Sequence, residues 1–224
     1  MNKITTDVQN ADSVWKNQKT CLAPGIMLYE NIVSGLEYFR LMSLINDRTM
    51  HWTMGIIVKS RDPEENTDST EGKLNLKIRN CGSIAMPYDR NDTENFIGDQ
   101  NMIETQQKVH DILLPIFTSI EDDYMIDFGI KKRTWHSRLE ILKYDVGQFF
   151  ENHIDTVPGI LRTVSMVMYL NDDYSGGEIV FPRFDLAIKP PKNSMLVFPS
   201  NYVYNHSAEK VTAGSKLAVA SFMS

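Results

Sequence analysis

A histidine and a carboxylate lie two residues apart in the C-terminal half of the sequence. His153 and Asp155 belong to the stretch QFFENHID. If this stretch is a β-strand, residues i and i+2 project from the same face, so an imidazole and a carboxylate converge on one point. A His-x-Asp sequence alone arises often by chance at strand ends and turns. A metal site therefore requires a third ligand from elsewhere in the chain.

The remaining histidines offer few choices for that ligand. His110 falls in a predicted helix, where a surface or half-buried position is expected, and His51 and His136 each adjoin a tryptophan in stretches without a clear pattern. His206 lies between two late β-like stretches, where a jelly roll brings it back across the barrel mouth. We therefore predict His206 as the third ligand. Two histidines and one carboxylate leave adjacent coordination positions open, which suits non-haem Fe(II) better than structural zinc.

A lysine follows this constellation. Lys216 stands ten residues after His206, at the start of the apolar stretch LAVASF, and alternation along a strand turns it toward the barrel interior. A buried lysine is costly unless it is paired with an anion. Iron oxygenase chemistry of this kind takes electrons from 2-oxoglutarate, whose distal carboxylate needs a buried cation. Without the metal site upstream, a lysine at a solvent-exposed strand end is the ordinary interpretation.

The elements around these residues are predicted to be short strands. From Ser137 onward, turn residues separate the stretches RLEILKY, QFFENHID, RTVSMVMYL, EIVFP, DLAIKP, SMLVFP and KLAVASF. Many short strands with frequent turns are typical of a sandwich or jelly roll. The fold class is therefore mainly β with flanking helices (α+β), around a jelly-roll core.

The N-terminal half predicts a strand and a helix after a polar loose tail at residues 1–20. The strand covers Gly25–Glu30. Ser34 begins the helix, because Glu37 follows it three residues later as in a capping box. The apolar residues of that helix are predicted to form one buried face: Leu36, Phe39, Leu41, Leu44 and Ile45.

Two β-like stretches and a second helix follow. The stretches are Gly55–Val58 and Leu74–Ile78, and the charged, turn-rich segment Ser60–Gly72 between them is predicted to be a surface loop. We hypothesise that this loop is a lid over the substrate entrance. The second helix is predicted over Asp99–Ile120, with an apolar stripe that serves the core. The stripe is Met102, Val109, Ile112, Leu113, Ile116, Phe117 and Ile120.

Length and composition limit the classes of function. The chain has 224 residues with 42% hydrophobic and 23% charged residues, and we expect one domain, with residues 21–136 as a buttressing, substrate-side half and 137–224 as the metal-binding β-core. The net charge of −6 argues against a nucleic-acid partner, which requires a basic surface. Cys21 and Cys81 form no metal-binding motif. No signal peptide or membrane span is evident, so a cytoplasmic location is predicted.

The motifs of the C-terminal region resemble those of prolyl 4-hydroxylases, which are Fe(II)- and 2-oxoglutarate-dependent dioxygenases. Five motifs in order carry the resemblance, from about Leu139 to Phe222: LKYDVGQFFENHID, RTVSMVMYLND, SGGEIVFP, IKPPKNSMLVFP and NHSAEKVTAGSK. The resemblance implies a double-stranded β-helix fold. It also implies Fe(II), 2-oxoglutarate and O₂ as cofactor and co-substrates, with ascorbate supporting activity.

Individual residues take roles from the same resemblance. Iron would be held by His153, Asp155 and His206, and the distal carboxylate of 2-oxoglutarate by Lys216. Tyr144 matches the tyrosine that opens the YxxGQ motif and lines the co-substrate pocket. Tyr169 matches a position where some relatives place a hydroxyl on the same carboxylate. Arg162 matches an arginine near the substrate mouth, although a surface charge at a strand start would explain it nearly as well.

Four positions depart from the family pattern. Ile179 replaces the usual threonine after Gly-Gly-Glu, which would give the co-substrate a further hydroxyl, and Tyr169 is the residue expected to compensate. Phe150 and Phe222 replace a tyrosine and a tryptophan on the substrate side, so the chemistry is better supported than a peptidyl-proline substrate. Asn193 replaces a glycine, which is tolerable because asparagine accepts left-handed turn geometry.

The resulting prediction is a dioxygenase that hydroxylates an unactivated C–H bond, in a prolyl or other amino-acid residue of a peptide or protein, with release of succinate and CO₂. An oxygenase acting on a free amino acid or other small molecule is one alternative. A jelly-roll metal-binding or structural module without turnover is another, although such a module has no need of Lys216. Asp155 argues against a halogenase, which would lack the carboxylate, and a nucleic-acid demethylase would favour arginine over Lys216.

Overall fold

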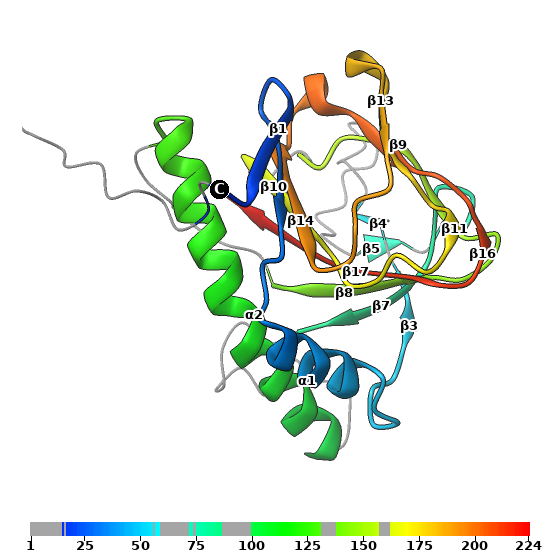
Figure 1. Cartoon of the computed structure of the whole chain (residues 1–224). Helices are drawn as coiled ribbons and strands as arrows, with labels where there is room; N and C mark the ends of the chain where they lie inside the picture. Colours follow the sequence, from blue (N-terminus) through cyan, green and yellow to red (C-terminus); the bar gives the residue numbers. More distant parts are fainter. Residues whose placement is uncertain are drawn as a thin grey trace, which may run out of the picture.

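Two antiparallel β-sheets form the centre of the described structure (Figure 1). The computed structural model describes residues 15, 17–55, 57–58, 72–73, 75–86, 100–130, 138–156 and 162–224. The larger sheet has eight strands, in the order β1 (Lys19–Ala23), β2 (Ile26–Glu30), β14 (Ser194–Pro199), β10 (Val164–Tyr169), β17 (Lys216–Met223), β8 (Glu140–Tyr144), β7 (Gly82–Ala85) and β3 (Thr53–Met54).

The smaller sheet carries the two histidines predicted as metal ligands, His153 and His206. Its five strands are β13 (Leu186–Ile188), β12 (Ile179–Phe181), β15 (His206–Ala208), β9 (Phe149–His153) and β6 (Arg79–Asn80). Two-stranded pairs join β11 (Ser175–Gly176) to β16 (Val211–Ala213) and β4 (Ile57–Val58) to β5 (Gly72–Lys73), and 3-10 turns cover Pro182–Phe184 and Tyr202–Tyr204. The predicted mainly β fold with a double-stranded β-helix core is confirmed.

Alternation along β10 shows how the larger sheet divides the interior. Met166 and Met168 pack in the cluster that includes the helices, whereas Tyr169 packs with Ile179 and Phe181 of the smaller sheet. Successive side chains of a strand point to opposite faces, so Ser165 lies on the same face as Tyr169. The space between the sheets is therefore lined by one face of each strand, and it is here that polar residues of β10, β8 and β17 gather.

Helix α2 (Gln100–Asp127) covers the outer face of the larger sheet (Figure 1). Its predicted apolar stripe is confirmed, since five of those residues are buried and Ile112 and Ile116 are partly buried. The helix runs seven residues past the predicted end at Ile120, because two side chains of the last turns bind the β1–β2 hairpin. The hydroxyl of Tyr124 donates to the Gly25 carbonyl at 2.8 Å, and Asp123 accepts from Tyr29 at 2.8 Å. Neither described helix has the length and hydropathy to cross a membrane.

Helix α1 (Gly35–Ile45) begins as predicted, but its buried face is narrower. The Ser34 hydroxyl accepts from the Glu37 amide at 3.4 Å, which confirms the cap. Leu41 and Ile45 are buried, whereas Leu36 and Phe39 are 82% and 74% exposed. The prediction for these two was wrong, because at about 100° per residue they lie on the face opposite Leu41.

The predicted loose tail is partly wrong. Lys19 belongs to β1, and its ammonium lies 2.8 Å from Asp123 and 2.5 Å from Asp127 of α2. The ion pairs fix a polar strand that hydrophobic periodicity alone does not reveal. The rest of that tail, apart from Trp15 and residues 17–18, lies outside the described residues.

Other N-terminal predictions shift by a few residues. Residues 76–78 form a turn where a strand was predicted over Leu74–Ile78, and the strands that flank it are β5 and β6. The strand predicted at Gly55–Val58 is reduced to β4, and Ile56 lies outside the described residues. The proposed lid, Ser60–Gly72, also lies outside them, apart from Gly72 in β5.

Candidate metal and 2-oxoglutarate site

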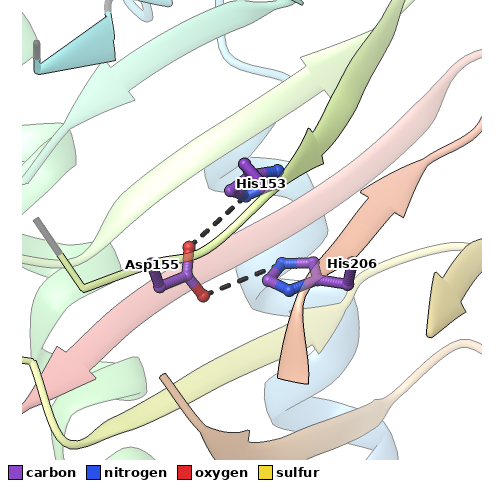
Figure 2. A group of neighbouring side chains, drawn as sticks. All are labelled: His153, Asp155 and His206. Atoms are coloured by element: carbon purple, nitrogen blue, oxygen red, sulfur yellow. Dashed lines mark ion pairs between the residues drawn. The ribbon is translucent and has the colours of Figure 1, made fainter. Parts of the chain in front are cut away.

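Antiparallel pairing of β9 with β15 brings the predicted metal ligands together. His153 is the last residue of β9 and His206 the first of β15, and the two are direct cross-strand partners. Asp155 follows β9 by two residues and turns its carboxylate toward both rings (Figure 2). The structure thus places all three residues at one end of the space between the sheets.

The three side chains present one ligand atom each to a common point. The Nε2 of His153 lies 3.4 Å from Oδ1 of Asp155, and the Nε2 of His206 lies 3.7 Å from Oδ2 (Figure 2). All three ligand atoms lie within 4.8 Å of one another. Neighbouring ligands of an octahedral ion with bonds of about 2.1 Å are about 3 Å apart. A divalent ion therefore fits with small movements of the side chains.

Backbone carbonyls hold both imidazoles in the orientation that a metal needs. The Nδ1 of His153 donates to the Glu151 carbonyl at 2.7 Å, and the Nδ1 of His206 donates to the Tyr204 carbonyl at 3.0 Å. A histidine whose Nδ1–H is bound in this way keeps the lone pair of Nε2 free for a cation. The tautomer required of a ligand is thus set by the backbone.

A pair of buried serines holds the carboxylate, and sequence reasoning missed them. The Ser165 hydroxyl donates to Oδ2 of Asp155 at 2.6 Å and lies 2.7 Å from the Ser200 hydroxyl. Both serines are fully buried. The sequence contained a sign of the role of Ser165, because this serine is the one hydroxyl residue among the apolar residues in the middle of β10.

Aromatic rings surround the two histidines. The Phe150 ring stacks on His153, with centroids 3.6 Å apart and planes 13° apart. Phe198 and Phe181 lie 4.8 and 5.4 Å from the His206 ring. The departure at Phe150 therefore places an apolar ring against a predicted metal ligand.

Burial and mutual charge set the protonation of the triad. Burial would raise the pKa of Asp155, but the charges of His206 and His153 and the bonds from His153 and Ser165 outweigh it, so the pKa lies below its usual range. Burial lowers the pKa of His206 to about 4, against the opposing pull of Asp155. An ionised carboxylate beside a neutral imidazole is the form that binds a cation.

Lys216 lies inside the barrel, as its position on the strand predicted. Its side chain is buried, and the ammonium donates to the Gly177 carbonyl at 2.7 Å. It lies 5.3 Å from the ring centroid of Tyr144, its cross-strand partner on β8, and 5.2 Å from that of Tyr169 on β10. The alternative of a solvent-exposed strand end is wrong. Burial lowers the pKa of Lys216 to about 8, and Glu178 opposes that shift.

The surroundings of Lys216 call for an anion. Among the described residues, no carboxylate lies within ion-pair distance of this ammonium, and one carbonyl and two ring faces are its partners. A buried cation without a counter-charge is unfavourable. The site is thus chemically suited to a ligand carboxylate, such as the distal carboxylate of 2-oxoglutarate.

Tyr144 and Tyr169 both contribute to the walls of this site. Burial raises the pKa of each well above its ordinary value, so both hydroxyls stay protonated and can donate. The Tyr144 hydroxyl also lies near the buried thiol of Cys81. Ile179, at the family's threonine position, packs in the apolar cluster with Tyr169 and offers no hydroxyl.

Arg162 lies beside the metal ligands. Its guanidinium stacks 3.8 Å from the Phe222 ring centroid and donates to the Asp155 carbonyl at 3.1 Å. The Thr156 hydroxyl donates in return to the Arg162 carbonyl at 2.6 Å. The Arg162 side chain is therefore held by Phe222 of the last strand and by the backbone of Asp155.

The other singled-out positions lie elsewhere. His110 is buried in α2, which corrects the predicted surface or half-buried position, and His51 is exposed. His136 is outside the described residues. Asn193 adopts a φ of 59°, and its side chain bonds the Val33 amide and carbonyl at 2.9 Å each, which confirms that it accepts left-handed geometry.

Comparison with known proteins identifies relatives of the C-terminal core. Residues 139–224 match the profile of the 2OG-Fe(II) oxygenase superfamily. The chain is 37% identical over 67 residues to a probable prolyl 4-hydroxylase 11 of Arabidopsis thaliana, which covers 27% of this chain and 24% of the relative. It is 35% identical over 86 residues to a PKHD-type hydroxylase of Methylobacterium nodulans, covering 33% and 37%. The matches thus span well under half of these relatives.

Solved structures share the fold over most of the chain. A prolyl hydroxylase of Trichoplax adhaerens, in complex with a hypoxia-inducible-factor peptide fragment, aligns with a TM-score of 0.63 at 15% identity, covering 89% of this chain and 83% of the other. A viral collagen prolyl hydroxylase of Paramecium bursaria Chlorella virus-1, in its 2OG complex, aligns with a TM-score of 0.55 at 18% identity, covering 89% and 95%. The resemblance to prolyl 4-hydroxylases seen in the sequence is confirmed.

Proposed function

We propose that this chain, whose C-terminal core is that of a prolyl 4-hydroxylase-like 2OG-Fe(II) oxygenase, hydroxylates a prolyl or other amino-acid residue of a peptide or protein. The superfamily implies Fe(II), 2-oxoglutarate and O₂. Fe(II) with these co-substrates supplies an oxidant that inserts one oxygen atom into an unactivated C–H bond, while 2-oxoglutarate leaves as succinate and CO₂. We assign His153, Asp155 and His206 as the metal ligands.

The observation that carries the proposal is the buried ammonium of Lys216, which has no ion-pair partner among the described residues and lies in the same interior as the triad. A metal-binding shell without turnover gains nothing from such a charge, whereas a dicarboxylic co-substrate neutralises it. We assign Lys216, Tyr144 and Tyr169 to that co-substrate. Lys216 holds the distal carboxylate, so the 2-oxo acid end is directed toward the metal ligands.

The peptide substrate rests on weaker support. One relative is named a probable prolyl 4-hydroxylase, and one structural neighbour is a prolyl hydroxylase in complex with a peptide fragment. Arg162 is our candidate for the substrate side, because it is held beside Asp155 and near the barrel mouth. Phe150 and Phe222 are engaged with His153 and Arg162 and offer no hydrogen bonds to a peptide backbone. An oxygenase acting on a free amino acid or other small molecule is therefore the second candidate.

We also propose that the chain forms one oxygenase domain. Strands from the N-terminal half pair with the core on both sides, β2 with β14 and β7 with β8. These pairings support a buttressing role for residues 21–136.

A turnover assay tests the proposal. The protein is supplied with Fe(II), 2-oxoglutarate and ascorbate, together with proline-containing peptides or with free amino acids. We expect succinate and CO₂ in a one-to-one ratio with a product heavier by one oxygen atom. Turnover with free amino acids alone would favour the small-molecule reading. Metal binding without any succinate, across both sets of substrates, would favour a binding module and reject the enzyme.

A further inference from the structure

The hydroxyl of Tyr174 is buried and has no hydrogen-bond partner in the part of the chain that the structure describes. The residue is 3% exposed, and its hydroxyl oxygen makes no hydrogen bond to the described residues. Buried polar groups are almost always bonded, so an orphaned one calls for an explanation such as a ligand. Tyr174 lies outside the five family motifs, which assigned roles to Lys216, Tyr144 and Tyr169.

Packing places the Tyr174 ring in the buried interior, against Gly177. It belongs to the interior cluster that contains Tyr144 and Val211. The Tyr174 ring packs closely on Gly177: a Cβ atom added to this glycine would lie 3.1 Å from Cε2 of Tyr174. The carbonyl of the same glycine accepts the hydrogen bond from the Lys216 ammonium at 2.7 Å. Tyr174 and Lys216 thus contact the same residue from within the same interior.

The protonation of these groups matches donation to an anion. Burial, with the charges of Glu178 and Asp172, raises the pKa of Tyr174, so its hydroxyl keeps its proton. Burial, with smaller contributions from Tyr174 and Tyr144, likewise raises the pKa of Tyr169, so this hydroxyl also keeps its proton. The Lys216 ammonium and the protonated tyrosine hydroxyls are thus hydrogen-bond donors in a buried environment, which suits a carboxylate.

We propose that Tyr174 donates a hydrogen bond to the distal carboxylate of the 2-oxo acid and so selects a dicarboxylic co-substrate. The inference rests on the proposed function, because it assumes that Lys216 binds that carboxylate. It also explains the departure at Ile179. The hydroxyl that the family supplies by a threonine on β12 is replaced here by a phenol from the turn before β11.

Two probes separate this role from general packing. 2-Oxoglutarate and 2-oxopentanoate have the same five-carbon chain, but the second carries a methyl group in place of the distal carboxylate. Each is titrated by calorimetry into anaerobic protein loaded with Mn(II), so that binding is read without turnover. The variants are Tyr174→Phe and, as a matched control, Tyr124→Phe, which also loses a buried phenol hydroxyl but in α2, where it donates to Gly25.

We expect Tyr174→Phe to weaken 2-oxoglutarate about tenfold or more, the effect of one hydrogen bond to a charged acceptor, and to leave 2-oxopentanoate unchanged. Tyr124→Phe should leave both affinities unchanged. In urea unfolding without a 2-oxo acid, Tyr124→Phe should be less stable than wild type, whereas Tyr174→Phe should not, because it removes a hydroxyl that has no partner.

Equal 2-oxoglutarate affinity in wild type and Tyr174→Phe would overturn the inference, as would an equal loss for both probes. A loss of ligand-free stability in Tyr174→Phe as large as that in Tyr124→Phe would also overturn it, because the hydroxyl would then have a structural partner. If wild type binds neither probe, the proposed function fails as well.

Discussion

Replacing Lys216 by methionine tests whether the buried charge serves a ligand or the fold. Methionine has a similar length and no charge, so the interior remains filled. The fall in the pKa of Lys216 from 10.5 to about 8 corresponds to about 3 kcal/mol of unfavourable burial. Losing the bond to Gly177 offsets about 1 kcal/mol of this. The ligand-free variant should therefore be more stable than wild type by about 2 kcal/mol at pH 7.

Binding of 2-oxoglutarate should change in the opposite direction. A charge-assisted bond contributes about 1.5–3 kcal/mol, and about 1.4 kcal/mol is one decade in affinity, so the variant should bind about tenfold to a hundredfold more weakly. Lys216→Arg should recover part of the loss, limited by geometry rather than charge. Iron affinity should barely change, because the lysine is not a ligand.

Urea unfolding gives the stability, and titration of 2-oxoglutarate into anaerobic Fe(II) protein, followed by the visible charge-transfer band, gives the affinity. Lys192→Met is the control, because Lys192 is exposed on the turn before β14. Equal 2-oxoglutarate affinity in Lys216→Met and wild type would refute the co-substrate assignment. A less stable variant that binds normally would mark Lys216 as a structural residue.

Three further predictions concern the metal ligands, the pH and the serine pair. Fe(II) binding, measured by calorimetry, should be abolished in each of the variants His153→Ala, Asp155→Ala and His206→Ala, while the circular dichroism spectrum is unchanged. A variant that still binds Fe(II) would show that its residue is not a ligand. The ammonium of Lys216 must be charged to bind an anion, and its pKa is about 8. The affinity for 2-oxoglutarate should therefore be constant below pH 8 and fall by up to about tenfold per pH unit above it. An affinity that stays constant up to pH 10 would contradict this. Ser165→Ala should weaken Co(II) binding by about tenfold or more, with recovery in Ser165→Thr, and unchanged affinity would exclude a role in holding Asp155.

The sequence predicted the site better than the N-terminal half of the fold, for physical reasons. The alternation of β17 turns Lys216 inward, so local geometry was sufficient there. The strand predicted to reach Asp155 ends at His153, and the bend after β9 brings the Asp155 carboxylate to the histidines. The pairing of His206 with His153 is long-range, and only a jelly-roll topology predicts it. Lys19 was missed because ion pairs with α2, rather than apolar periodicity, fix its strand. The hydroxyl of Tyr174 could not be assigned because an orphaned group is visible only in three dimensions.

The eight-stranded sheet has a consequence for any attempt to isolate the region that matches the superfamily profile. Residues 139–224 contain β8, β10, β14 and β17, but not the strands that flank them, β2 and β7. Expressed alone, this fragment would have β14 and β8 as bare sheet edges, with unpaired amides and carbonyls that other copies could extend. It would also lose α2, which covers Met166 and Met168. The segment that the profile matches is thus a poor folding unit, and we expect it to aggregate without the preceding residues.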